Sequence, residues 1–204
     1  MRAHVLSDLH LYHDNIIGYC SRPFADVEEM NRHFVFEWNA RVADDDVVVI
    51  VGDMSAGLGA RRDEYAELLK SLRGKKVLIR GNHDHEPDDW YLENGFQSVK
   101  EHLCVVGVLF HHYPPSDDRS DNRSVPWGVR CALRYIEQYK PWAFLHGHDH
   151  RVDVPERAGC FNCASDRLGH APIPLFDALY KVDSELAQQR IRHVEAALAD
   201  LVRG

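Results

Sequence analysis

The sequence lacks the features that would place the protein in a membrane or outside the cell. No apolar run approaches the roughly 20 residues that a membrane-spanning helix needs. Met1 leads directly into an apolar run typical of a strand, so we expect no signal peptide. Cysteine is sparse, and five residues, an odd number, favour reduced thiols over a disulfide framework. These absences predict a cytoplasmic protein.

The chain also has fewer basic than acidic residues. The chain has 24 Lys and Arg against 32 Asp and Glu, which gives a formal net charge of −8. This charge opposes indiscriminate binding to nucleic acid or to anionic membranes, because both require a basic surface. It still allows a nucleotide or a single strand end to be held by a metal site. The length of 204 residues is sufficient for one α/β domain with a substantial core.

Three common site motifs are missing. The segment after Asp53 has glycines but no GK[ST] sequence of a phosphate-binding loop. Ser55 does not form a nucleophile elbow, because Asp53 stands where the first Gly should be. Cys160 and Cys163 form one CxxC with no second pair, which favours buried structural thiols over a zinc or redox site.

Histidine, in contrast, is abundant, with 14 residues, and several follow short apolar runs typical of buried strands. Ligands collect at the carboxyl ends of strands in open α/β sheets, so we expect these strand ends to form one site. The polar residues that follow the five runs are Asp8 and His10, Asp53, Asn82 to Asp84, His111 and His112, and His146 to His150.

Apolar periodicity predicts the remaining elements. Helices are expected near 26–38, 61–73, 87–93, 129–136 and 183–203, and further strands near 97–105, 107–110 and 160–164. The polar segment 114–128 is a candidate loop on the substrate side. No internal repeat or linker interrupts the pattern, so one domain over 1–204 is expected.

The strand-end residues resemble the calcineurin-like metallophosphoesterase superfamily. Its pattern is DxH, GD, GNH followed by Asp or Glu, a single His, and GHxH, each after a strand. The matching residues are Asp8-Leu9-His10, Gly52-Asp53, Gly81-Asn82-His83-Asp84, His112 and Gly147-His148-Asp149-His150. The segment from Asp8 through Arg22-Pro23-Phe24 also looks like a group of small bacterial and phage phosphoesterases.

The resemblance covers about residues 1–175 and implies an α/β fold. Two facing mixed β-sheets would be flanked by helices, and the helix at 183–203 would be an addition to the family core. The apolar stripe of that helix must be buried, either against its own domain or against a second copy in a dimer. Leu186, Ile191, Val194, Leu198 and Leu201 form this stripe.

The resemblance also implies two divalent metal ions bridged by Asp53. Manganese is favoured, with iron, zinc and nickel as alternatives for Asp, Asn and His ligands. The ligands carried over by position are Asp8, His10, Asp53 and His150 for one ion and Asp53, Asn82, His112 and His148 for the other.

The implied chemistry is phosphoester hydrolysis by a hydroxide that the two metals activate. His83 would act as general acid and Asp84 would orient it. His13 and Arg22 are candidate contacts for the substrate phosphate, with a solvated loop as the equal alternative. The expected substrate is a small or nucleotide-derived phosphodiester, with a phosphomonoester as the alternative.

Some assignments stay open. His111 and His112 are adjacent and would face opposite ways in an extended segment, and the family pattern favours His112 as the ligand. His146 would either support the site or simply be packed. A non-catalytic scaffold is a further alternative, because a retromer subunit shares this fold. We disfavour it because the chain keeps every ligand position and His83.

Overall fold

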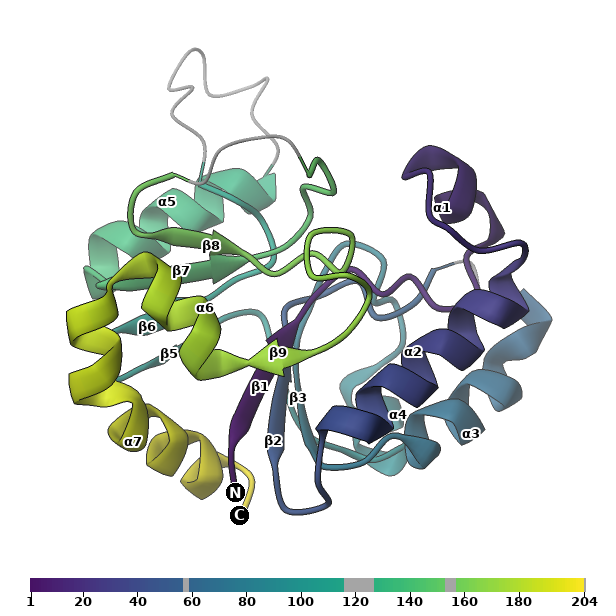
Figure 1. The fold of residues 1–204 in the computed structure, drawn as a ribbon, viewed down its shortest axis with the longest axis horizontal. Helices are drawn as coiled ribbons and strands as arrows, with labels where there is room; N and C mark the ends of the chain where they lie inside the picture. The colour runs from purple at the N-terminus through teal and green to yellow at the C-terminus, as the bar shows by residue number, and fades with distance from the viewer. Residues whose placement is uncertain (57–58, 116–126, 153–156, 204) are drawn as a thin grey trace.

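The structure is a computed structural model that describes residues 1–56, 59–115, 127–152 and 157–203. Within these residues two mixed β-sheets face each other, and helices cover their outer sides (Figure 1). This arrangement confirms the predicted α/β sandwich. No helix in the described part of the chain is both long and apolar enough to cross a bilayer.

The first sheet has the strand order β4-β3-β2-β1-β9. The first four strands in the chain are parallel, and β9 pairs antiparallel with β1, which makes the sheet mixed. Their bounds are β1 Ala3–Leu6, β2 Val47–Ile50, β3 Lys75–Ile79, β4 Phe96–Lys100 and β9 Ile173–Pro174.

The second sheet has the order β5-β6-β7-β8. Strand β5 pairs antiparallel with β6, and β6, β7 and β8 are parallel. Their bounds are β5 Leu103–Val105, β6 Val108–Phe110, β7 Ala143–His146 and β8 Cys160–Asn162.

The two faces of the first sheet are both buried. Val5 and Val49 point into the core between the sheets, whereas Leu6 and Ile50 point into the core beneath the covering helices. Side chains alternate between the faces of a strand, so a strand covered on both sides is apolar throughout. This explains why Val47–Ile50 has no polar residue.

Local sequence signals set the ends of the covering helices. Asp26 caps α2 (Val27–Arg41) by accepting a hydrogen bond of 2.7 Å from the Glu29 amide. Helix α3 (Arg62–Ser71) follows the short 3₁₀ helix η1 (Gly59–Arg61), and Gly74 with φ +81° allows the turn into β3. Helix α4 (Asp88–Glu93) begins after Pro87, as predicted, and α5 (Trp127–Tyr139) covers the second sheet.

Helix α7 (Ser184–Leu201) is capped by Asp183 and packs on its own chain. Val194 and Leu198 are buried in the core between the sheets, and Ile191 and Leu201 pack against it. These four residues of the stripe are therefore covered by their own chain. That α7 is an addition to a family core, and that it contributes to an oligomer, stay predictions.

Two short helices were not predicted. Helix α1 (Asp14–Tyr19) lies in the segment expected to be a loop, and α6 (Leu175–Val182) precedes α7. Most of the predicted substrate-side loop at 114–128 lies outside the described residues.

Candidate functional site

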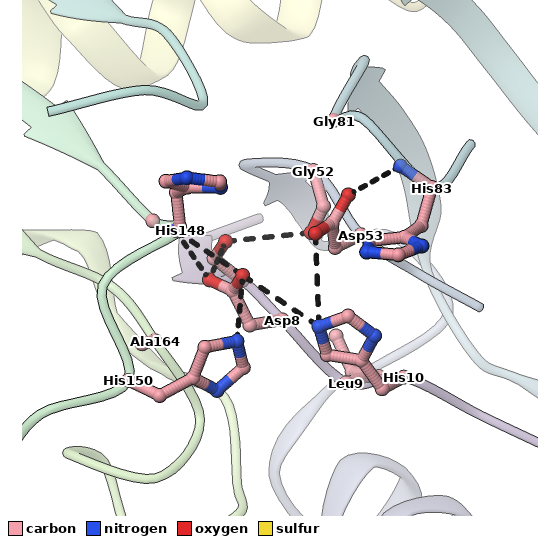
Figure 2. A network of polar contacts seen from close by, with 12 residues as sticks. Asp8, Leu9, His10, Gly52, Asp53, Gly81, His83, His148, His150 and Ala164 are labelled. Atoms are coloured by element: carbon pink, nitrogen blue, oxygen red, sulfur yellow. Dashed lines mark hydrogen bonds and ion pairs between the residues drawn. The ribbon is translucent and has the colours of Figure 1, made fainter. Parts of the chain in front are cut away.

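The loops after β1, β2, β3 and β7 bring their polar residues to one place. Figure 2 shows the side chains of Asp8, Asp53, His10 and His150 pointing toward a common centre, with His83 beside them and the backbone amide of His148 facing Asp8. The strand ends therefore converge as the sequence predicts. The roles of the individual residues are considered below from their contacts.

The first group of ligand atoms belongs to Asp8, His10 and His150, and these atoms lie within 4.8 Å of one another. His150 Nε2 is 3.5 Å and His10 Nε2 is 4.0 Å from Asp8 Oδ1. Both ring nitrogens of His10 are buried and have no hydrogen-bond partner among the described residues. Buried polar atoms normally have partners, so this orphaned ring fits a ligand for a cation.

The second group belongs to Asp53, His112 and His148. His112 Nε2 lies 3.4 Å from Asp53 Oδ2, 3.3 Å from His148 Nδ1 and 3.2 Å from Asn82 Oδ1. Asp53 Oδ2 is also 3.6 Å from His10 Nε2. One carboxylate therefore lies between the two groups.

Hydrogen bonds at the far side of two imidazoles orient them toward the centre. His112 Nδ1 lies 2.8 Å from the Val51 carbonyl, to which it donates, and this leaves Nε2 to face Asp53. His150 Nδ1 lies 2.7 Å from Asp166 Oδ2, and its Nε2 faces Asp8. Metal-binding histidines are commonly oriented in this way.

Asp166 is a residue of the site that the sequence analysis missed. It follows β8 by only a few residues, so the strand-end pattern would have included it had β8 been examined in the same way. The hydrogen bond from Arg22 and that from His150 lower the pKa of Asp166 against the effect of burial, so the carboxyl is ionised.

Four of the candidate ligands have unusual backbone conformations. Asp8, His10, Asp53 and His148 have φ values of 57°, 51°, 53° and 67°, in the left-handed region that non-glycine residues rarely adopt. The backbone at Asp8 and His10 is therefore not the extended continuation of β1 in which side chains two positions apart would share a face. Their side chains still converge, because the amides of both residues donate to backbone carbonyls of the loop after β2.

Two motif glycines allow the loops to approach closely. A Cβ atom at Gly81 would overlap the Asp53 carboxylate, and one at Gly147 would overlap Ser7 Oγ and the Asp8 carboxylate. Any side chain would displace a candidate ligand. Steric crowding therefore explains why glycine stands at the first position of GNH and of GHxH in this chain.

The electrostatics of the centre favour a cation. Burial raises the pKa of Asp8 and lowers the pKa of His10 to about 2. His148 is more exposed, and partial desolvation together with the charge of His112 lowers its pKa to about 4, so both imidazoles are neutral at pH 7. Burial also opposes charge on His112, but its hydrogen bond to Asp53 and the charges of Asp8 and Asp53 raise the pKa to about 9. A proton on His112 thus supplies positive charge between two carboxylates.

The Asp84 carboxylate contacts backbone amides of the loops that carry the site. Its buried carboxylate accepts hydrogen bonds of 2.8 Å from the Asp53 and Gly81 amides and of 2.9 Å from the Met54 amide. Burial and the charge of Asp53 raise the pKa of Asp84 to about 6. Its oxygens are directed at three backbone amides, and the expectation that Asp84 orients the His83 ring stays a prediction.

His83 and His13 lie at the rim of the centre. The His83 amide donates to Asp53 Oδ1 over 2.8 Å, and its half-buried ring is 5.2 Å from the His10 ring. The His13 ring is 5.3 Å from that of His10 and 6.1 Å from that of His83. Both rings are thus placed beside the candidate metal ligands.

Arg22 is not at the rim. Its side chain is fully buried, and its guanidinium donates to Asp166 and to the backbone carbonyls of Asp8 and Leu9. This placement argues against the expected contact with substrate, because the donors face the protein interior.

Two further histidines at strand ends, His111 and His146, are buried outside the two groups of candidate ligands. His111 Nδ1 lies 3.3 Å from the Tyr113 carbonyl, and its ring meets that of Tyr135 edge-on. His146 is buried, with Nδ1 3.0 Å from the Gly147 carbonyl. His111 and His112 face different surroundings, and only His112 belongs to a group of candidate ligands in the described structure.

Two known proteins are similar in sequence to parts of this chain. A protein of Methanocaldococcus jannaschii, named only as uncharacterised, is 45% identical over 83 residues, which are 41% of this chain and 47% of that protein. The match therefore spans about half the length of that relative. The gene 66 protein of Mycobacterium phage L5 is 28% identical over an alignment of 172 positions, which covers 74% of this chain and 78% of that protein.

A solved structure shares the fold. A protein of unknown function from Aquifex aeolicus aligns with a TM-score of 0.69 at 22% identity, over 90% of this chain and 98% of that one. The family model for calcineurin-like phosphoesterases matches residues 1–152, which include every candidate metal ligand. The chain therefore belongs to the calcineurin-like phosphoesterase family.

Proposed function

We propose that this protein is a phosphoesterase that uses two divalent metal ions. The observation that carries the proposal is the position of Asp53, whose Oδ2 is 3.6 Å from His10 Nε2 and 3.4 Å from His112 Nε2. A single carboxylate between two groups of ligand atoms is the arrangement that a pair of bridged ions requires.

The donor atoms fit hard or borderline divalent ions. Asp8, His10, Asp53 and His150 would hold one ion, and Asp53, Asn82, His112 and His148 the other. Bound ions would supply Lewis acidity and a water of lowered pKa. Manganese is our first choice, and iron, zinc and nickel suit the same oxygen and nitrogen donors.

His83 is the proposed general acid. Its backbone amide is tied to Asp53 Oδ1, which keeps the residue at the centre, and its ring is half-buried and close to His10. A protonated imidazole at this position would donate its proton to the leaving-group oxygen. His13, beside it, is the proposed contact for the substrate.

The proposed substrate is a small or nucleotide-derived phosphodiester, with a phosphomonoester as the alternative. The formal net charge of −8 supports a small substrate, because a long nucleic acid would be repelled by an acidic surface. A scaffold without activity would not require a bridging carboxylate together with His83 beside it, so we favour an enzyme.

A substrate and metal screen tests the proposal. Metal-free protein is reconstituted with Mn²⁺, Fe²⁺, Zn²⁺ or Ni²⁺ and assayed on p-nitrophenyl mono- and diesters, 2′,3′-cyclic nucleotides and dinucleotides. We expect metal-dependent hydrolysis, with diesters preferred, and none by Asp53→Asn protein prepared in the same way. Equal hydrolysis by Asp53→Asn protein, or none by the unmodified protein with any metal, would reject an enzyme of this type.

A further inference from the structure

Arg22 lies at the centre of a buried hydrogen-bond network behind the candidate metal ligands. Its Nε and Nη2 donate to the two oxygens of Asp166 over 2.8 and 2.9 Å, in a bidentate pair. Its Nη1 donates to the Leu9 carbonyl and Nη2 to the Asp8 carbonyl, both over 2.7 Å. The side chain of Arg22 is 0% exposed.

The same carboxylate that binds Arg22 also binds a ligand histidine. Asp166 Oδ2 accepts from His150 Nδ1 over 2.7 Å, and His150 Nε2 lies 3.5 Å from Asp8 Oδ1. The contacts form a closed path from the Asp8 backbone through Arg22, Asp166 and His150 to the Asp8 side chain. Two candidate ligands that are far apart in the chain, Asp8 and His150, are thus linked through one buried pair.

Ser165 supports the network from the same segment. Its Oγ donates to the Asp8 carbonyl over 2.8 Å and lies 3.2 Å from Arg22 Nη2. Its amide donates to the Ser7 carbonyl over 2.9 Å. The segment after β8 is therefore attached directly to the end of β1, where Asp8 and His10 begin the site.

The backbone that Arg22 holds is strained. Asp8 and His10 both have positive φ, a conformation that is unfavourable for residues other than glycine. Charge-assisted hydrogen bonds to the carbonyls of Asp8 and Leu9 offset part of this cost. The Arg22 charge is balanced by Asp166, so the pair adds no net charge near the metal ligands.

We infer that Arg22 and Asp166 are positioning residues that set the geometry of Asp8, His10 and His150 before an ion binds. Arg22 holds the left-handed turn that carries Asp8 and His10. Asp166 holds the His150 ring so that Nε2 faces Asp8. This role rests on the proposed metal site, and it replaces the substrate contact expected for Arg22.

The chemistry requires arginine at this position. Its planar fork reaches a carboxylate and two carbonyls at once, whereas a lysine ammonium has a single centre and cannot satisfy both sets of acceptors. Arg22→Lys therefore keeps the positive charge but cannot bind the Asp166 carboxylate and the two carbonyls at the same time. Asp166→Asn keeps the size of the side chain and removes the acceptor pair for the guanidinium.

The test measures Mn²⁺ binding to metal-free protein by calorimetry, with circular dichroism to select a temperature at which each variant is folded. We expect Asp166→Asn and Arg22→Lys to weaken one of two Mn²⁺ sites about 10–100-fold, the usual effect of removing a partner of a metal-binding histidine. The other site, with Asn82, His112 and His148, should keep its affinity. Arg41→Lys, at an exposed Arg–Glu pair on α2, is the matched control and should leave both sites unchanged.

The outcomes separate this inference from the proposed function. If the unmodified protein binds no Mn²⁺, the proposed metal site fails. If it binds two ions, and both variants bind them with unchanged affinity and only melt at a lower temperature, Arg22 and Asp166 are structural and the positioning role is overturned. Selective weakening of one site in both folded variants supports the role.

Discussion

The carboxylate of Asp84 accepts a hydrogen bond of 2.8 Å from the backbone amide of Asp53. The same carboxylate binds the amides of Met54 and Gly81, so it joins the loop after β2 to the loop after β3. Asp53 lies between the two groups of candidate ligands, and its backbone position therefore depends on a neighbour that does not face the substrate side.

Substitution of Asp84 tests this relationship. In Asp84→Asn, an amide NH₂ replaces one oxygen and faces backbone N–H groups, which leaves a buried donor without an acceptor and destabilises the fold by about 1–3 kcal/mol. We expect a lower melting temperature and weaker metal binding. Hydrolysis should fall by the same factor for esters with good and poor leaving groups. A larger loss with the poor leaving group would show that Asp84 acts through His83 instead.

Asp53→Asn should impair metal binding more than any single His substitution. It removes a negative charge that faces both groups of ligands, whereas His148→Ala removes a neutral ligand from one group. Metal analysis after reconstitution should approach two ions per chain for the unmodified protein, one for His148→Ala and fewer for Asp53→Asn. Retention of both ions by Asp53→Asn would contradict a bridging role.

His83→Ala should leave both ions bound and slow catalysis. The expected loss is about 10²–10⁴-fold for an ester with a poor leaving group, the usual range for general acid catalysis. An ester of p-nitrophenol requires little protonation of its leaving group, so its loss should be smaller. Rates for the two esters, together with metal content, provide the measurement. Equal losses, or a missing ion, would assign His83 another role.

Leu198 tests the packing of α7. It is 0% exposed in the core between the sheets, so Leu198→Ala should lower the free energy of unfolding by about 2–5 kcal/mol. Leu92→Ala is the control, because Leu92 is 47% exposed and its truncation should have a small effect. Light scattering should give the same mass for both variants. A change of mass in Leu198→Ala alone would indicate that α7 also contacts a second copy.

The buried Lys76 makes the free energy of unfolding depend on pH in the alkaline range. Burial lowers its pKa to about 8 in the folded protein, from 10.5, although its ammonium donates to the Leu72 carbonyl over 2.8 Å. Between these values the unfolded chain binds more protons, so stability rises with pH through this window. The free energy of unfolding should rise relative to Lys76→Met by about 1.4 kcal/mol per pH unit. The free energies of unfolding of both proteins are measured with urea between pH 8 and 10.5. If they change in parallel with pH, the lowered pKa of Lys76 is disproved.

Much of the fold follows from local patterns in the sequence. The apolar run at Val47–Ile50 predicts a strand covered on both faces, and Asp26 and Asp183 predict the starts of α2 and α7. The short helices α1 and α6 were missed for a local reason. Helix α1 has six residues, one of them Gly18, and α6 has eight residues, so neither is long enough for the periodic stripe that marks a helix.

By itself the sequence determined five of the strand ends that carry the site, because polar residues directly after buried strands can point only to the edge of the sheet; the end of β8, with Asp166, was not among them. It did not determine what each of those residues contacts. Asp84 follows His83 in the chain but binds the amide of Asp53, and Arg22 reaches Asp166 across 144 positions. Only the tertiary structure decided these partners, because a buried charge is stabilised by whichever donors and acceptors the packed loops bring to it.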